Sequence, residues 1–193
     1  MDLTQGTERQ KNERAKKMML WFGIVSLLMG FAGWTSAYII SSKREDWIKD
    51  FNLPSLFYVS TAIILFSSIT YFLAKNCIKK DKTKQGTLLL LLTLILGVFF
   101  IVFQFNGFSQ MVAAGYYFTG PTSSIKMSYI FLIAMVHIVH VVVGLISLLV
   151  VLNNQIKGKY TTEDYLGVSL GETFWHFLGL LWVYLILFMS IVE

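Results

Sequence analysis

The stretch MSYIFLIAMVHIVHVVVGLISLLVVL, from Met127 to Leu152, decides the fold class of this chain. It contains 26 residues and no Asp, Glu, Lys or Arg. A helix of about 20 apolar residues crosses a hydrocarbon core of about 30 Å. Because a helix satisfies its own backbone hydrogen bonds, which lipid cannot do, this stretch predicts a transmembrane helix.

Four further runs share this character, at about 18–40, 55–74, 87–108 and 173–192. The chain is 55% hydrophobic and only 14% charged, which is unusual for a soluble domain. The apolar region of a signal peptide is shorter than run 18–40, so we expect that run to stay in the mature protein. We therefore predict an all-α integral membrane protein, a five-transmembrane-helix bundle in which residues 1–193 form one domain.

The charged residues crowd between these runs. The net charge is +5, but no charged side chain occurs from Gln85 to Ile125, so a nucleic-acid partner is not expected. Twelve of the 16 Lys and Arg residues lie in the N-terminal tail and after the second and fourth runs. Short cytoplasmic segments carry the excess of positive charge, which predicts the N-terminus inside and the C-terminus outside.

Small and polar residues recur along one side of several runs. Since helices in lipid associate through small residues and interhelical hydrogen bonds, we expect these sides to pack inside the bundle. They comprise Ser26, Gly30, Gly33 and Ala37 in the first run, Ser60, Thr61, Ser67 and Ser68 in the second, Thr93, Gly97, Gln104 and Gly107 in the third, and His137, His140, Gly144 and Ser147 in the fourth.

Few ionisable residues lie in the runs. No carboxylate lies well inside one, since Glu172 only begins the last, and the three histidines are His137, His140 and His176. The first two, three residues apart, could share a metal, whereas His140 and His176 differ in depth by roughly 12 Å, which disfavours a haem between them. Structural histidines bonded to neighbouring helices are favoured; a metal or haem site and a water or proton relay stay open.

Four segments resemble subunit III of the haem-copper oxidases, the third subunit of cytochrome c oxidase. They read STAIILFSS at 60–68, LGVFFIVFQ at 96–104, MVHIVHVVVG at 135–144 and FWHFLGLLW at 174–182, in the family's order. The residues that carry the resemblance are Thr61, Ser67, Ser68, Gly97, Gln104, His137, His140, Gly144, Trp175, His176 and Trp182.

The resemblance implies a non-redox accessory subunit that supports the catalytic subunit of a proton-pumping respiratory terminal oxidase, which reduces O2 to water in aerobic electron transport. It implies no catalytic, cofactor or metal site in this chain, with haem and copper in partner subunits. The implied partners are catalytic subunit I, other oxidase subunits and membrane lipids, and a respiratory supercomplex stays open. The implied location is the bacterial inner (cytoplasmic) membrane, as a multi-pass protein. The electron donor, cytochrome c or a quinol, is not determined.

The chain also departs from the resembled family. Longer members have seven helices, so five runs resemble the short bacterial form. Leu27, Gly107 and Gly179 stand where the family often has acids, so a proton-antenna role for those carboxylates is not expected. Two alternatives remain: a b-type cytochrome anchor that uses His137 or His140 with His176, and a small membrane transporter, which would need a polar path and usually internal repeats.

Overall fold

The computed structural model describes residues 6–48, 51, 53–120, 123–162 and 164–192. It contains five helices: α1 (Glu8–Ser41), α2 (Ser55–Lys79), α3 (Thr83–Ala113), α4 (Ile125–Ile156) and α5 (Leu166–Ile191). All five are long and apolar enough to cross a membrane, and these ranges contain no β-strand. The prediction of an all-α chain with five such helices is confirmed.

The helices extend beyond the apolar runs that predicted them. α1 begins ten residues before Met18, because Thr7 and Gln10 form a capping box at its start and a polar first section follows. α5 begins at Leu166, seven residues before the predicted span. The apolar run shows which part of a helix can lie in the hydrocarbon core of a membrane. Capping residues and backbone hydrogen bonds determine where the helix itself begins.

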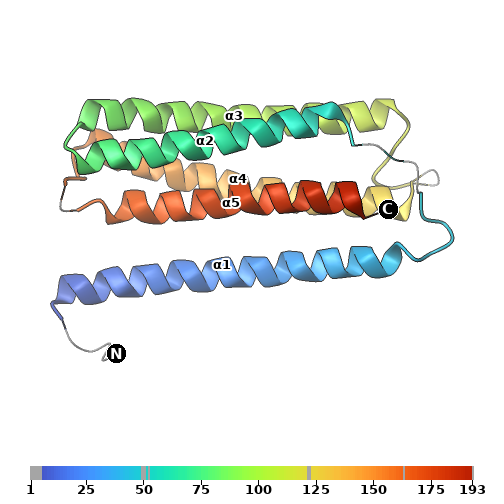
Figure 1. Cartoon of the computed structure of the whole chain (residues 1–193), viewed down its shortest axis with the longest axis horizontal. Coiled ribbons are helices and arrows are strands. Elements are labelled where there is room, and N and C mark those ends of the chain that lie inside the picture. Colours follow the sequence, from blue (N-terminus) through green and yellow to red (C-terminus); the bar gives the residue numbers. More distant parts are fainter. Residues whose placement is uncertain (1–5, 49–50, 52, 121–122, 163, 193) are drawn as a thin grey trace.

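Consecutive helices run antiparallel along a common axis (Figure 1). We call the end that holds the start of α1 and the α2–α3 and α4–α5 connections the N-terminal end, and the other the C-terminal end. Because the number of described helices is odd, the start of α1 and the end of α5 lie at opposite ends of the bundle. At the C-terminal end, hydrogen bonds from the Arg44 guanidinium to the exposed carboxylate of Asp46 lower the pKa of that carboxyl group.

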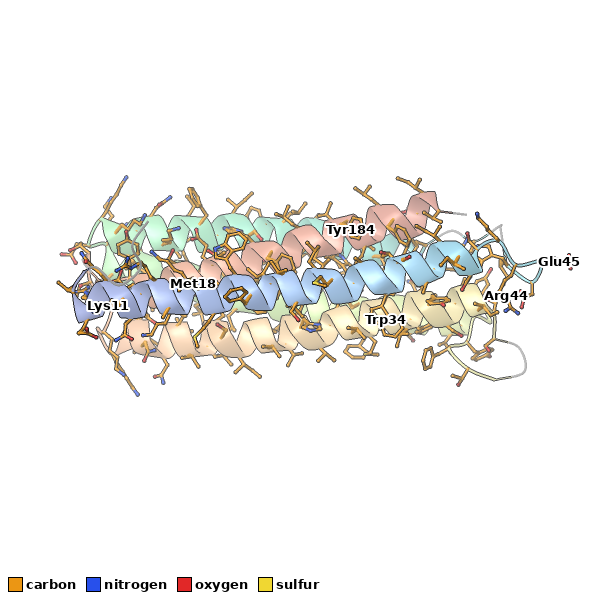
Figure 2. The ribbon with its side chains drawn as sticks, turned by 90° about the horizontal axis from the view of Figure 1, so that it is seen from below. Lys11, Met18, Trp34, Arg44, Glu45 and Tyr184 are labelled. Atoms are coloured by element: carbon orange, nitrogen blue, oxygen red, sulfur yellow. The ribbon has the colours of Figure 1, made fainter. Side chains whose placement is uncertain are left out.

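Helices α2 to α5 pack together, and α1 stands apart alongside α4 and α5 (Figures 1 and 2). The α1 side chains that face the bundle are Ile24, Phe31, Thr35 and Tyr38. Tyr184 of α5 is labelled in Figure 2, and its hydroxyl donates to Thr35 Oγ1 of α1 at 3.3 Å. These four side chains therefore make the buried contacts of α1 with its neighbours.

This arrangement corrects the predicted packing face of α1. Ser26, Gly30 and Gly33 are exposed and Ala37 is only half-buried. A Cβ atom added at Gly30 or Gly33 would meet nothing within 4 Å. The prediction is wrong here because a stripe of small residues permits close approach but does not require it, and α1 meets its neighbours with the opposite side.

The predicted packing face of α3 is confirmed. Thr93, Gly97, Gln104 and Gly107 are all buried. A Cβ atom at Gly107 would lie 2.9 Å from Cε2 of Phe57, so an aromatic side chain of α2 occupies the space that the glycine leaves. The faces of α2 and α4 are confirmed in part, since each has two buried members and two half-buried members.

Candidate functional site: a polar seam between the helices

Two tryptophans of α5 donate hydrogen bonds to hydroxyl groups of α2. Trp175 Nε1 donates to Ser67 Oγ at 3.0 Å, and Trp182 Nε1 donates to Thr61 Oγ1 at 3.1 Å. The tryptophans are seven residues apart, which places them two turns apart on one helix face. Because α2 and α5 are antiparallel, the later tryptophan meets the earlier hydroxyl (Figure 1). These paired contacts hold the two helices in one register.

The hydroxyl groups of α2 accept these bonds through their oxygen lone pairs while donating their own protons within the helix, Thr61 to the carbonyl of Phe57 at 2.8 Å. Ser67 Oγ donates to the carbonyl of Ile64 at 2.7 Å, and Ser60 Oγ donates to the carbonyl of Phe57 at 2.7 Å. A hydroxyl has one proton and two acceptor lone pairs, so its oxygen stays free to accept. Gln104 Nε2 of α3 donates to Ser60 Oγ at 2.8 Å, so a third helix joins the polar contacts between α2 and α5.

Two glycines enclose the ring of Trp175. A Cβ atom at Gly97 of α3 would lie 2.7 Å from Cη2 of this tryptophan, and one at Gly144 of α4 would lie 3.3 Å from its Cε3. The indole therefore fills the space left by two missing side chains while its nitrogen reaches α2. Gly97, Gly144, Trp175 and Ser67, four residues of the family-like segments, form one packed layer across four helices.

His137 belongs to a second layer, together with Trp182. Its ring stacks on that indole with centroids 5.0 Å apart and planes 23° apart, and Phe31 and Phe100 approach it edge-on at 6.2 Å. The ring is fully buried, and neither nitrogen has a hydrogen-bond partner in the part of the chain that the structure describes. The expectation that this histidine bonds to a neighbouring helix is wrong; it packs as an aromatic ring.

The other two histidines, unlike His137, have polar partners within their own helices. His140 Nδ1 lies 2.7 Å from the carbonyl oxygen of Val136, one turn earlier in α4. His176 Nε2 lies 3.6 Å from Oε1 of Glu172, one turn earlier in α5. Among the described residues, no three His, Cys, Asp or Glu side chains come together as a candidate metal site.

Glu172 lies inside α5, although the predicted span begins one residue after it. It is the seventh residue of α5, it is 3% exposed, and its Oε2 forms an ion pair with Lys75 Nζ of α2. The expectation that no carboxylate lies well inside a span is wrong for α5, because this helix begins at Leu166, before the apolar run, and buries Glu172. The Glu-x-x-x-His spacing with His176 was a local signal, but Lys75 becomes its partner only through the packing of α2 against α5.

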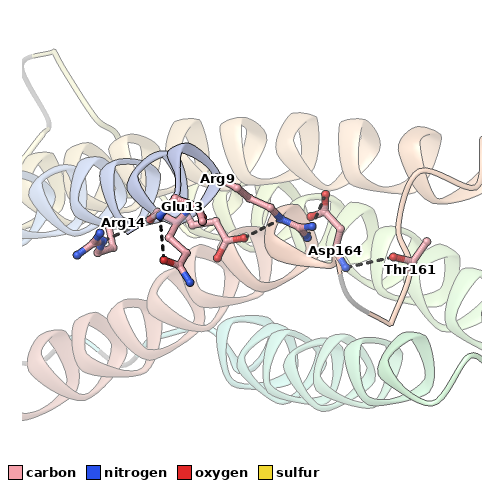
Figure 3. Close-up of polar contacts among 7 residues, drawn as sticks. Arg9, Glu13, Arg14, Thr161 and Asp164 are labelled. Carbon is pink, nitrogen blue, oxygen red and sulfur yellow. Dashed lines mark hydrogen bonds and ion pairs between the residues drawn. The ribbon is translucent and has the colours of Figure 1, made fainter. Parts of the chain in front are cut away.

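Polar contacts also join α1 to the α4–α5 connection at the N-terminal end (Figure 3). Arg9 Nε lies 3.4 Å from Oε1 of Glu13, and its guanidinium reaches Oδ2 of Asp164 at 3.8 Å. The backbone N–H of Asp164 donates to Thr161 Oγ1 at 3.1 Å. Exposed pairs of this kind contribute little stability, so they orient the start of α1 rather than hold the fold.

Comparison with known proteins gives the family. Residues 34–192 match the family model described as cytochrome c oxidase subunit III. The chain is 34% identical over 133 residues to the cytochrome bo(3) ubiquinol oxidase subunit 3 of Pseudomonas aeruginosa. The aligned residues make up 69% of this chain and 62% of that protein. It is 30% identical over 155 residues to a probable cytochrome c oxidase subunit 3 of Rickettsia felis, covering 77% of this chain and 54% of that protein. The chain thus spans less than two thirds of the length of either relative. It belongs to the cytochrome c oxidase subunit III family.

Proposed function

We propose that this chain is a non-redox accessory subunit of a proton-pumping respiratory terminal oxidase in a bacterial inner membrane. The observation that carries the proposal is that the family-like residues pack the helices together. The buried side chains of Trp175 and Trp182 donate hydrogen bonds to α2. The buried glycines Gly97 and Gly144 leave space that side chains of neighbouring helices fill. A rigid bundle of transmembrane helices of this kind is suited to support a neighbouring catalytic subunit. The haem and copper are, in this proposal, bound by partner subunits.

The proposed orientation places the N-terminal end of the bundle in the cytoplasm. The argument is the distribution of Lys and Arg along the sequence, where twelve lie in the N-terminal tail and after the second and fourth apolar runs and four lie in the other connecting segments. Residues 1–193 act on this proposal as one domain, with the C-terminus on the outer side of the membrane.

The proposed partners are catalytic subunit I, other oxidase subunits and membrane lipids. Many large apolar side chains are exposed on the outer faces of the helices, among them Phe22 and Met29 of α1 and Leu180 of α5. Such faces are compatible with lipid or with another transmembrane helix. One relative is named as a ubiquinol oxidase subunit and another as a cytochrome c oxidase subunit, so both electron donors stay compatible with the family.

Affinity purification of the full chain from native membranes tests the proposal. We expect a haem-copper catalytic subunit to co-purify in fixed proportion, with the haem spectrum assigned to that partner. A Soret band from the chain purified alone would contradict the non-redox role and favour the b-type cytochrome anchor. Recovery without any oxidase subunit, under conditions that keep the complex intact, would reject the accessory role.

A further inference from the structure

A groove of about 540 Å³ runs between α2 and α5 on the outer surface of the bundle. Its walls are formed by Leu65, Ser68, Ile69 and Phe72 of α2 and by His176 and Leu180 of α5. A Cβ atom at Gly179 would lie 3.2 Å from Oγ of Ser68, so the absence of a side chain there leaves room beside the serine. The groove faces the side that lipid would cover, because Ile69 and Leu180 are 55% and 66% exposed.

Two polar groups of this otherwise apolar groove are available to a ligand. The Ser68 hydroxyl has no hydrogen-bond partner among the described residues. His176 turns Nε2 toward the buried carboxylate of Glu172, at 3.6 Å, and within the described ranges Nδ1 has no partner. When Nε2 carries the proton, the nitrogen Nδ1 is an acceptor. The groove is therefore lined by one imidazole and one hydroxyl group beside the aromatic side chain of Phe72.

The charges nearby decide what kind of head group fits. Lys75 is already paired with Glu172, and both side chains are largely buried, at 18% and 4% exposure. An anionic head group would meet a cation that is already neutralised and a carboxylate behind His176. The walls of the groove are also mostly hydrocarbon and aromatic, and dehydrating an ionic head group against such walls is costly. A neutral head group with hydroxyl donors suits the site.

We propose that this groove binds a membrane-dissolved quinol, with His176 Nδ1 accepting a hydrogen bond from a ring hydroxyl. Ser68 contacts another polar edge of the head group, Phe72 packs against the ring, and the apolar tail follows Leu65 and Leu180. The proposal concerns binding alone and includes no electron transfer. It goes beyond the accessory role and stands whether the oxidase takes its electrons from cytochrome c or from a quinol.

Photolabelling of the full chain in nanodiscs of phosphatidylethanolamine and phosphatidylglycerol tests this site, with an azido derivative of decylubiquinol as the probe. We expect saturable labelling of residues 65–72 and 176–180, competed by unlabelled decylubiquinol. His176→Phe should weaken binding about threefold to tenfold, the change expected for one lost hydrogen bond. Gly179→Leu should abolish labelling, since its side chain would fill the groove.

A second groove supplies a control within the same molecule. It has a volume of about 230 Å³ and is lined by hydrocarbon side chains of α3, namely Leu94, Ile95, Val98, Phe99 and Val102. Any labelling there should rise linearly with probe concentration and should not respond to His176→Phe. The His176→Phe and Gly179→Leu variants must keep the helical content and the thermal unfolding temperature of the parent chain. If they do not, labelling of the Ser68→Ala variant, which removes only one hydroxyl group, provides a second test.

Three results would overturn the proposal. The first is equal, unsaturable labelling of both grooves. The second is competition by oleyl alcohol or phospholipid as strong as that by decylubiquinol, which would identify the groove as an ordinary lipid contact. The third is labelling that His176→Phe and Ser68→Ala leave unchanged. Co-purification with oxidase subunits is a separate measurement, so failure of the quinol site and failure of the accessory role can be told apart.

Discussion

Replacing Gly144 with leucine perturbs the layer that surrounds Trp175. A Cβ atom at this position would lie 2.8 Å from Cδ1 of Leu178 and 3.3 Å from Cε3 of Trp175, and the leucine would add three further carbons. Leu178 can rotate away, but Trp175 is confined between Gly97 and its hydrogen bond to Ser67. The substitution must therefore displace either the indole or the backbone of α4.

The expected cost has two parts. Overpacking of a close-packed interior costs about 1–3 kcal/mol. Loss of the Trp175–Ser67 hydrogen bond adds about 1 kcal/mol. The free energy of unfolding should thus fall by about 2–4 kcal/mol for Gly144→Leu and by less for Gly144→Ala, whose single methyl meets chiefly the flexible end of Leu178. Val142→Leu is the matched control, because Val142 is 40% exposed on the same helix and should change stability by about 0.5 kcal/mol or less.

Reversible unfolding of the full chain in mixed detergent micelles, followed by tryptophan fluorescence, measures these differences. The amount of assembled oxidase recovered from membranes that express each variant provides an independent reading. Equal unfolding free energies for Gly144→Leu and Val142→Leu, with equal amounts of assembled complex, would refute the reasoning. That outcome would mean that α4 does not approach α5 through its glycine.

Four further predictions address the ion pair, the histidines, the orientation and the role of the chain. Glu172→Gln should destabilise the chain by about 1–3 kcal/mol, because Lys75 would lose its partner in a largely buried place, and adding Lys75→Met should recover part of that loss in the same unfolding assay. His140→Gln should leave the haem and copper content of the purified complex unchanged; loss of either with assembly intact would promote the metal or haem hypothesis. Cys77, in the last turn of α2 and therefore at the N-terminal end of the bundle, should react with an impermeant thiol reagent only after the cytoplasmic face is opened, and labelling from outside intact cells would reverse the orientation. An oxidase depleted of this chain should keep its redox spectrum and initial O2 reduction while its activity declines in sustained turnover, and normal spectra without initial turnover would contradict the accessory role.

The number of helices that can span a membrane could be predicted from the amino-acid sequence. Membrane thickness sets the length of apolar run that a helix needs, so the prediction depends only on local composition. The buried side of α3 was equally readable, because Thr93, Gly97, Gln104 and Gly107 repeat with the period of one helix. Residues that carry the family resemblance were recognisable for the same reason, since each motif lies within a few turns of a single helix.

The tertiary structure alone decided which of these faces meet. Ser67 and Trp175 are 108 positions apart, and the bond between them depends on the register of two antiparallel helices. The exposed stripe around Gly30 and the burial of Glu172 beside Lys75 are decided in the same way, by the distance and rotation of each helix relative to its neighbours. In lipid, apolar burial does not favour one helix face strongly over another, so close fit and hydrogen bonds between distant residues select the arrangement.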